Sequence, residues 1–312
     1  MWFVLVHFLW TKDEYLNSFL LGILTLFLFR EYTCIKNYNI IREENILKTV
    51  VITGSGRGLG LELARCFAKQ GMKIVLNDLN AERLHEAKAE IEKLPGGSKV
   101  YACAGNVALY EDMQQLARYA REQCGQIDIW INNAGMNQPM KPVWELTERE
   151  ISLLVDVDLK GAVLGSKAAM EIMAAQGHGA IYNMEGYGSN DAMMLGLNMY
   201  GTPKRAVTHF TQALAKESEE KQTGVMVGRV SPGIMITDFT VKALGDQEAI
   251  DLPEKTKKVY NILGDYPDVV AAFLSERMLQ NTKNNAHIEW LTGGKAAWRF
   301  MTAGFNKRDF FK

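Results

Sequence analysis

The chain has 312 residues, of which 47% are hydrophobic and 23% are charged, a balance typical of a globular protein with one large α/β domain or two small domains. Its 35 Lys and Arg residues nearly equal its 36 Asp and Glu residues, so no net charge draws it to nucleic acid or anionic lipid, and a small molecule is the expected ligand. The 4 cysteines are far apart and the 5 histidines form no metal-binding motif. We therefore predict reduced thiols, no metal site and a domain that faces the cytoplasm.

Residues 1 to 45 are predicted to form an apolar extension and a polar linker, ahead of one folded domain of residues 46 to 312. As a helix, the apolar run of residues 15 to 29 would span about 22 Å, which is short of the ~30 Å hydrocarbon core of a bilayer. Basic residues follow this run, so a membrane segment here would leave the downstream domain in the cytoplasm. A membrane anchor, a helix that packs in an oligomer and an over-long gene start all stay open, whereas the features of a secretory signal are missing.

The most informative stretch is residues 49 to 60, where an apolar run is followed by glycines at every second position. Val50, Val51 and Ile52 favour a strand buried on both faces, and the amphipathic residues after them predict a helix over residues 58 to 70. Glycines let the backbone turn tightly where free N–H groups of a helix can bind a diphosphate, although a merely flexible loop would have a similar composition. The residues expected to bind a dinucleotide here are Thr53, Gly54, Ser55, Arg57, Gly58, Leu59 and Gly60.

The next predicted strand, residues 72 to 77, ends at Asp78, 18 residues after Gly60. This spacing is close to the roughly 20 residues expected for a carboxylate that binds the adenosine ribose. A carboxylate at this place repels a 2′-phosphate, so Asp78 favours NAD. Alternatively, Asp78 would cap the helix predicted over residues 80 to 94.

Strands predicted over residues 98 to 104 and 126 to 131 each end in candidate site residues. The pair Asn-Val follows the first strand, and the tetrapeptide Asn-Asn-Ala-Gly follows the second. Amide side chains can bridge neighbouring backbones, and small residues leave room for a cofactor. The cofactor-binding candidates in these two stretches are Asn106, Val107, Asn133, Ala134 and Gly135.

A strand predicted over residues 178 to 184 precedes Tyr200 and Lys204, which lie four positions apart. On a helix these two residues share a face, and an ammonium near the phenol would lower its pKa. Tyr200 would then act as a general acid in reduction or as a general base in oxidation. Pro203 places the start of this helix near Tyr200. The same spacing also occurs on ordinary helix faces.

The spacing Thr-Gly-x-x-x-Gly-x-Gly, the Asn-Asn-Ala-Gly tetrapeptide and Tyr-x-x-x-Lys together resemble the short-chain dehydrogenase/reductase family. The resemblance implies an α/β fold, a doubly wound parallel sheet (Rossmann fold) with the strand order 3-2-1-4-5-6-7. It implies hydride transfer between NAD or NADP and a carbonyl or alcohol substrate, and a homo-oligomer.

The resemblance also assigns roles to single residues. Lys204 would bind the nicotinamide ribose, and Asn106 with Val107 would lie beside the adenine. Arg57 matches a basic residue that is common in members that prefer NADP, against the indication from Asp78. The residues that would contact the nicotinamide after a sixth strand, predicted over residues 224 to 230, are Pro232, Gly233 and Thr237.

Two positions depart from the family pattern. Asp158 stands in place of an active-site Asn, inside a long helix predicted to begin at a capping Thr147 and to end near residue 175. The family Asn helps to hold a water in a proton relay; an Asp would hold it too, but its charge would make the pKa of the site depend on it. Gly186 stands in place of the serine that polarises the carbonyl. The candidates to hold the substrate oxygen are therefore Ser189, eleven residues before Tyr200, and the backbone around Gly186.

The run Asn-Met-Glu-Gly at residues 183 to 186 resembles the chlorophyll b reductase branch of the family, and Glu185 within it would act as an acid or face solvent. Members of this branch reduce a formyl group of a tetrapyrrole to hydroxymethyl, so the resemblance implies that reaction. A generic alcohol or ketone dehydrogenase is one alternative. A nucleotide-binding sensor or scaffold that has lost turnover is another.

The last part of the chain is predicted to contain a substrate lid over residues 238 to 265, a helix over residues 267 to 280 and a strand over residues 286 to 291. The tail of residues 295 to 312 mixes aromatic and basic side chains. It would cover an apolar substrate, touch a membrane surface or pack against another subunit.

Overall fold

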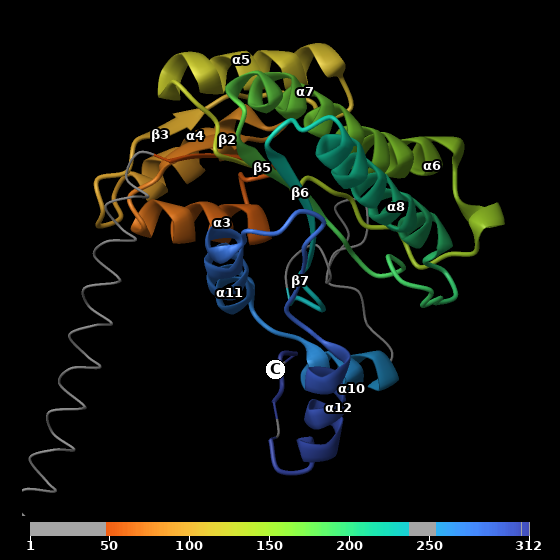
Figure 1. Ribbon diagram of the computed structural model, residues 1–312. Helices are drawn as coiled ribbons and strands as arrows, with labels where there is room; N and C mark the ends of the chain where they lie inside the picture. Colours follow the sequence, from red (N-terminus) through yellow and green to blue (C-terminus); the bar gives the residue numbers. More distant parts are fainter. Residues whose placement is uncertain (1–47, 237–253, 307, 312) are drawn as a thin grey trace, which may run out of the picture. The chain divides into compact units, whose positions relative to one another are not determined.

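The computed structural model describes residues 48–236, 254–306 and 308–311 (Figure 1). The chain divides into two units, Met1–Ile46 and Leu47–Lys312, and every described residue belongs to the second. The predicted extension of residues 1 to 45, Thr237 and much of the predicted lid therefore lie outside the described residues. None of the described helices is both long and apolar enough to cross a bilayer.

The described part of the chain contains one parallel sheet of seven strands in the order β3-β2-β1-β4-β5-β6-β7, which confirms the predicted fold class. The strands are β1 (Thr49–Thr53), β2 (Lys73–Asn77), β3 (Val100–Ala102), β4 (Ile129–Asn132), β5 (Gly179–Met184), β6 (Val225–Ser231) and β7 (His287–Glu289). The strand order reverses between β1 and β4. In open α/β sheets, ligands bind at the carboxyl ends of the strands beside such a reversal.

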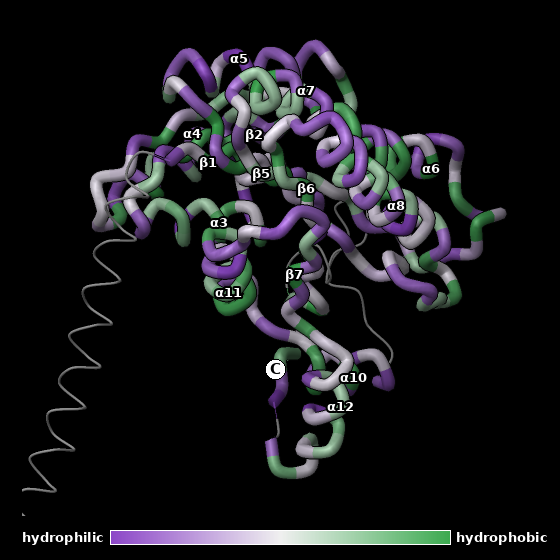
Figure 2. Tube along the Cα trace, in the orientation of Figure 1, coloured by the Kyte–Doolittle hydropathy of each residue, from purple (hydrophilic) through white to green (hydrophobic). Residues whose placement is uncertain are grey.

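Helices cover both faces of this sheet (Figure 1): α3, α4 and α11 contribute to the core on one face, and α5, α7 and α8 to the core on the other. The described helices are α3 (Gly58–Lys69), α4 (Ala81–Ile91), α5 (Tyr110–Cys124), η1 (Val143–Glu145), α6 (Glu148–Leu154), η2 (Val155–Lys160), α7 (Gly161–Gln176), α8 (Asn198–Glu220), α10 (Glu254–Leu263), α11 (Pro267–Gln280) and α12 (Gly293–Thr302). Figure 2 shows both hydrophilic and hydrophobic residues along α3, as expected for a helix that covers a core with one side.

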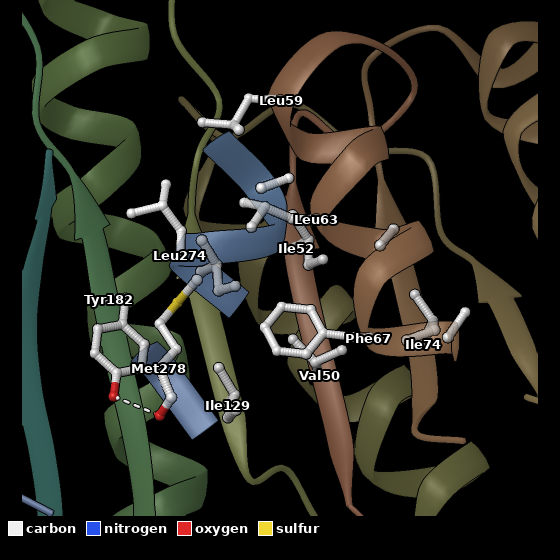
Figure 3. Packing of buried hydrophobic residues seen from close by; sticks show 14 of the residues in the cluster. Val50, Ile52, Leu59, Leu63, Phe67, Ile74, Ile129, Tyr182, Leu274 and Met278 are labelled. Atoms are coloured by element: carbon white, nitrogen blue, oxygen red, sulfur yellow. Dashed lines mark hydrogen bonds between the residues drawn. The ribbon is translucent and has the colours of Figure 1, made fainter. Parts of the chain in front are cut away.

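The alternation of side chains along β1 explains why both faces of the sheet carry a core. Val50 and Ile52 belong to the cluster shared with α3 and α11, whereas Val51 belongs to the cluster shared with α5 and α7. Figure 3 shows the first cluster, in which Tyr182 of β5 donates a hydrogen bond to the carbonyl of Met278 in α11. The two cores hold the strands in place, and with them the groups at their carboxyl ends.

Two helices differ from their predicted form. The long helix predicted from Thr147 consists of α6, the π-helical η2 and α7, although Thr147 and Glu150 do form the predicted capping box. Helix α8 begins at Asn198, two residues before Tyr200. Pro203 therefore lies in the second turn of α8, where it has no N–H to add to the helical hydrogen bonds.

Candidate active site

The glycine-rich turn joins β1 to α3. Gly54 and Gly58 have φ angles of +63° and +58°, which glycine adopts without the strain that a side chain would cause. A Cβ at Gly60 would overlap the carbonyl oxygen of Gly54, so α3 packs directly on the turn. By contrast, no described atom lies within 4 Å of the position that a Cβ of Gly58 would take. No side chain caps the first turn of α3, and uncapped N–H groups at the start of a helix are able to bind a diphosphate.

Side chains connect the end of β4 to this turn. Asn133 Nδ2 donates to the carbonyls of Thr53 and Gly54 at 3.0 Å each. Thr53 Oγ1 accepts hydrogen bonds from the backbone N–H groups of Asn133 and Ala134 at 3.0 and 3.1 Å. A Cβ at Gly54 would lie 2.7 Å from Ala134 Cα, so the two segments are in contact. The structure therefore brings the predicted residues of the first and fourth strand ends together.

Asp78 shapes the same turn from the end of β2. Its Oδ2 accepts from the N–H of Gly56 at 3.2 Å, its Oδ1 accepts from the N–H of Asn80 at 3.0 Å, and Oδ1 lies 3.6 Å from NH1 of Arg83. The cap of α4 is Asn80, whose side chain accepts from the N–H of Arg83. The alternative role of Asp78 as that cap is therefore wrong, and its contact with a ribose stays a prediction.

The other residues predicted on this side of the site have varied surroundings. Ser55 is buried, and its Oγ accepts from the N–H of Asn77 at 3.0 Å, which connects β2 to the turn. Arg57 is exposed at the start of α3. Asn106 Oδ1 accepts from the N–H of Ala108 at 3.0 Å, so this amide shapes its own loop.

Four further predicted residues contribute through packing or backbone. Leu59 and Val107 are buried among apolar side chains, so neither presents a polar group. Pro232 is buried just after β6, and Gly233 follows with a φ of +73°. A Cβ at Gly233 would lie 2.8 Å from Leu291 Cβ, so this turn packs closely on the segment after β7.

Tyr200, Lys204 and Asp158 meet beside the end of β4. Lys204 Nζ lies 2.8 Å from Asp158 Oδ1 and 5.7 Å from the centroid of the Tyr200 ring. The side chains of Lys204 and Asp158 are only 5% and 0% exposed. A Cβ at Gly135, the last residue of the tetrapeptide, would lie 2.8 Å from Asp158 Oδ1 and 3.4 Å from Lys204 Nζ. Three of the four predicted catalytic residues thus adjoin the predicted cofactor residues.

Burial and charge together set the protonation states at this centre. Burial raises the pKa of Tyr200, the Lys204 ammonium lowers it and the Asp158 carboxylate raises it, with a rise as the result. Burial lowers the pKa of Lys204, but Asp158 and Tyr200 outweigh burial and raise it. Burial also raises the pKa of Asp158, against the effect of Lys204. Lys204 is therefore a cation at neutral pH and Tyr200 a protonated phenol, because burial and Asp158 outweigh the predicted lowering by Lys204.

Asp158 lies within the π-helical segment η2. The segment η2 separates α6 from α7, and π-helical turns of this kind occur frequently at functional sites. The Asp158 carboxylate also accepts from the backbone N–H of Met136 at 3.2 to 3.3 Å. Asp158 contacts Lys204 directly, which the sequence-based comparison with a water-holding Asn did not anticipate.

Gly186 lies directly against the phenol of Tyr200. A Cβ at Gly186 would be 2.5 Å from Tyr200 Oη and 3.2 Å from Lys204 Cε. Ser189 instead bonds with backbone: its Oγ accepts from the N–H of Gly186 at 3.1 Å and donates to the carbonyl of Lys204 at 3.4 Å. Ser189 therefore closes the turn that contains Gly186, and which of the two candidates contacts a substrate oxygen stays a prediction.

Glu185 does not face solvent, contrary to one of the two predicted roles. Its side chain is 3% exposed, and its carboxylate accepts hydrogen bonds from the hydroxyls of Thr208 (2.8 Å) and Ser231. His287 Nε2 lies 2.9 Å away and Arg229 NH1 lies 3.5 Å away. Burial opposes ionisation of Glu185, but the hydrogen bonds from His287, Ser231 and Thr208 outweigh burial and lower its pKa to about 2. Nothing in the sequence pattern indicated these partners, because they come from three other elements.

The lowered pKa predicts how Glu185 affects stability in acid. The pKa of Glu185 falls from an ordinary 4.5 to about 2 on folding. Its contribution to the free energy of unfolding is therefore complete above pH 4.5 and is lost as the pH falls towards 2. A shift of this size corresponds to about 3 kcal/mol. We expect Glu185→Gln to be less stable than the wild type at pH 7 and the difference to narrow at pH 3. Urea unfolding at both pH values measures the stability difference between the two proteins. An equal difference at pH 7 and pH 3 would contradict the lowered pKa of Glu185.

Large apolar side chains are exposed on two loops beside Tyr200. Trp144, in the loop after β4, is 82% exposed, and Met193 and Leu195, in the loop after β5, are 92% and 94% exposed. In the first loop, the Gln138 side chain accepts a hydrogen bond from the N–H of Tyr200 at 2.8 Å. The sequence contained a signal for this rim, since three consecutive apolar residues at 193 to 195 stand between a strand and the catalytic helix.

The two apolar loops also touch each other. A Cβ at Gly196, in the second loop, would lie 3.2 Å from the carbonyl carbon of Met140, in the first. Met140 and Met194 are themselves 47% and 41% exposed. Both loops follow the carboxyl ends of neighbouring strands, the edge at which α/β proteins bind ligands. We refer to Met140, Trp144, Met193, Met194 and Leu195 as the apolar rim.

The chain is similar in sequence to known oxidoreductases. Residues 48–248 match the short chain dehydrogenase family. The chain is 30% identical over 280 residues to the probable chlorophyll(ide) b reductase NYC1 of Arabidopsis thaliana, covering 85% of this chain and 54% of that protein. It is 32% identical over 260 residues to the chlorophyll(ide) b reductase NOL of Oryza sativa subsp. japonica, covering 81% of this chain and 74% of that protein.

The chain thus spans about half the length of the NYC1 relative. Among solved structures, levodione reductase superposes with a TM-score of 0.71 at 26% identity, covering 80% of this chain and 98% of that chain. The matched region contains the glycine-rich turn, the Asn-Asn-Ala-Gly tetrapeptide and the Tyr200–Lys204 pair. The chain therefore belongs to the short chain dehydrogenase family of oxidoreductases.

Proposed function

We propose that this protein is an NAD(P)-dependent carbonyl reductase whose substrate is large and apolar, with formyl reduction on a tetrapyrrole as the specific reaction. The observation that supports it most is the protonated phenol of the half-buried Tyr200, whose ring centroid lies 5.7 Å from Lys204 Nζ, while Lys204 itself adjoins Gly135 of the Asn-Asn-Ala-Gly tetrapeptide. The residues present fit a dinucleotide, since the turn offers free N–H groups at the start of α3 and open space at Gly58.

When bound, the reduced nicotinamide supplies a hydride to the carbonyl carbon. As that bond forms, the π electrons of the C=O bond move onto the oxygen, and Tyr200 Oη gives the oxygen its proton. Lys204 stabilises the phenolate that remains, because its ammonium is buried close to the ring. The product is an alcohol, and a proton from solvent restores the phenol. The absence of a side chain at Gly186 leaves Tyr200 as the group that contacts the oxygen.

The protonation states favour reduction and predict the effect of Asp158→Asn. Asp158 raises the pKa values of both Tyr200 and Lys204, so removing its charge lowers both. Reduction requires the protonated phenol and is lost as the pH rises through the pKa of Tyr200. We therefore expect the alkaline limb of the kcat profile to move to lower pH in this variant. Asp156→Asn is the control, since Asp156 is half-exposed in the same segment and pairs with Lys160 at 3.6 Å; an unchanged limb in Asp158→Asn would contradict the assignment.

The apolar rim supports the choice of a large apolar substrate. Soluble proteins rarely leave several large apolar side chains exposed together unless the surface binds something. Methionine side chains adapt to different shapes, and Trp144 offers a flat aromatic surface. A tetrapyrrole with a formyl group suits such a rim, and the chlorophyll(ide) b reductase names of the relatives lead us to propose this substrate class.

A panel of carbonyl compounds tests the proposal. Formyl-tetrapyrroles and small ketones are assayed with NADH and with NADPH in parallel, and product is identified as the alcohol. We expect turnover of the formyl-tetrapyrrole and little turnover of small ketones. For the cofactor, Asp78 supports NADH and the exposed Arg57 supports NADPH; we propose NADH as the better reductant. Preference for small ketones would replace the proposal by a generic ketone or alcohol dehydrogenase.

One observation favours a second candidate function, a sensor or scaffold that binds the dinucleotide without turnover. The position of the family serine is occupied by Gly186, so a polarising hydroxyl is missing there. Under this alternative the protein would bind NADH or NADPH, show no activity on any carbonyl compound of the panel and keep its biological effect when Tyr200 is replaced.

A further inference from the structure

The cluster around Glu185 is the most heavily bonded buried charge next to the proposed active site, and the reaction does not use it. Its carboxylate contacts side chains from three elements: Thr208 of α8, Ser231 and Arg229 of β6, and His287 of β7. A buried carboxylate is costly unless hydrogen bonds and charges compensate for the lost water. The Glu185 carboxylate therefore carries a desolvation cost at a position where local structure alone does not require a charge.

Two contacts of Glu185, and its place in the chain, lead to different parts of the proposed active site. Glu185 is the residue before Gly186, whose Cα faces Tyr200 Oη. Thr208 lies one helical turn after Lys204, and its hydroxyl is also 3.2 Å from the Lys204 carbonyl. Ser231 is the residue before the Pro232 turn that is predicted to contact the nicotinamide. One side chain therefore connects the three segments that surround the reacting groups.

The backbone reinforces this connection. The N–H of Glu185 donates to the carbonyl of Val230 at 2.8 Å, so the ends of β5 and β6 stay paired one residue beyond β5. The strand register places Met184 beside Val230, which brings Glu185 beside Ser231. With its backbone fixed in this way, the Glu185 side chain reaches α8 on the face of the sheet that α7 and α8 cover.

Glu185, His287 and Ser231 do not form a catalytic triad of serine, histidine and acid. Ser231 Oγ lies 3.0 Å from Nε2 of His287, and the same Nε2 is the atom that contacts Glu185 at 2.9 Å. A serine, histidine and acid that relay a proton use the two different ring nitrogens. A single shared nitrogen cannot transfer a proton from serine to acid, so the arrangement suits a fixed structural charge.

We propose that Glu185 is a positioning residue, whose carboxylate holds Gly186, the Lys204 turn of α8 and the Ser231 turn in the geometry that hydride transfer requires. The inference rests on the proposed carbonyl reduction. A positioning role for Glu185 explains how this chain keeps a defined site without the family serine. The loop that would carry that serine is fixed by the hydrogen bonds of the ionised Glu185 side chain to α8 and β6. Small displacements of reacting groups can lower a rate about 100-fold, so a positioning role of this kind has a measurable effect.

The test compares Glu185→Gln, which keeps the size of the side chain and removes its charge, with Asp128→Asn. Asp128 is a matched control, because its side chain is only 13% exposed and also has bonded partners: it accepts from the N–H of Thr49 at 2.7 Å and lies 3.7 Å from His178. Asp128 precedes β4, so it lies at the amino ends of the strands, away from the proposed active site at their carboxyl ends. We measure kcat and KM for the carbonyl substrate, the dinucleotide Kd, the melting temperature, and amide hydrogen exchange at residues 186 to 189 and 231 to 233.

We expect Glu185→Gln to lower kcat by about 10- to 100-fold, with KM and Kd changed less than about threefold, and to speed up exchange in both segments. Asp128→Asn should lower the melting temperature without these changes. Thr208→Val should lower kcat in the same direction, and the double variant should lose less than the product of the two single effects, because both act through one contact.

The proposal is overturned if Glu185→Gln keeps kcat within about twofold of the wild type, or if Asp128→Asn loses as much. If the wild type reduces no carbonyl compound, the proposed function fails on its own account. In that case the exchange data still decide whether Glu185 fixes the two segments, since unchanged exchange in Glu185→Gln would reject the role independently of any activity.

Discussion

Tyr200→Phe is expected to lower kcat by about 10²- to 10⁴-fold, the usual contribution of a general acid. The substitution removes only the hydroxyl, so the ring still fills its place beside Gly186 and Lys204. The hydride donor and the carbonyl would both still bind, but the developing alkoxide would receive no proton from the enzyme. We therefore expect the dinucleotide Kd to stay within about twofold of the wild type, as for a loss confined to the transition state. Single-turnover reduction and fluorescence titration measure the two quantities.

Tyr182→Phe is the matched control for this prediction. Tyr182 is a buried tyrosine, and its hydroxyl donates to the carbonyl of Met278 at 3.2 Å in the core on the other face of the sheet. Burial raises its pKa to about 12, so it does not exchange protons near neutral pH. Tyr182→Phe should cost about 1 kcal/mol of stability and leave kcat unchanged. Full activity in Tyr200→Phe would show that another group supplies the proton.

Gly60→Ala is expected to weaken dinucleotide binding by about 10- to 100-fold. The added Cβ would overlap the carbonyl oxygen of Gly54 and lie 2.6 Å from Asn133 Nδ2. Relief requires the turn or the Asn133 bridge to move, and overpacking of this kind costs about 1 to 3 kcal/mol. Because the moving segment is the one that would bind the diphosphate, most of that cost falls on binding, at about 1.4 kcal/mol for each factor of ten.

Gly293→Ala serves as the control for Gly60→Ala. Gly293 is the first residue of α12, and no described atom lies within 4 Å of the position of its added Cβ. This variant should bind the dinucleotide as the wild type does. Calorimetric titration with NADH and NADPH gives both Kd values, and unchanged binding in Gly60→Ala would mean that the cofactor does not occupy the turn between β1 and α3.

Local patterns predicted single strands, turns and helices, because these depend on neighbours in the chain, whereas the family resemblance implied the doubly wound sheet and its strand order. Val50 to Ile52 followed by alternating glycines favour a buried strand and a tight turn. The spacing of Tyr200 and Lys204 fixes one shared helix face in the same way. Helix ends were less well predicted: the helix with Pro203 begins two residues before Tyr200, since tertiary packing tolerates a proline in its second turn.

The charges of the site could not be predicted in this way. Lys204 alone would lower the pKa of Tyr200, as the sequence suggested, but burial and the neighbouring Asp158 reverse the direction. Burial depends on how α7, α8 and the strand ends pack, and the 2.8 Å contact joins Asp158 in η2 to Lys204 in α8. Neither has a signature in local spacing, because both arise from segments that are distant in the chain.

By itself, therefore, the sequence determined the doubly wound fold, the glycine-rich turn and the identity of the groups that meet there. Only the tertiary structure decided that Gly186 faces the phenol, that Ser189 bonds with backbone and that Glu185 is a buried, ionised connection between three segments. The physical reason is that backbone conformation follows from local sterics and periodicity, whereas protonation and side-chain partners follow from burial and from contacts across the sheet.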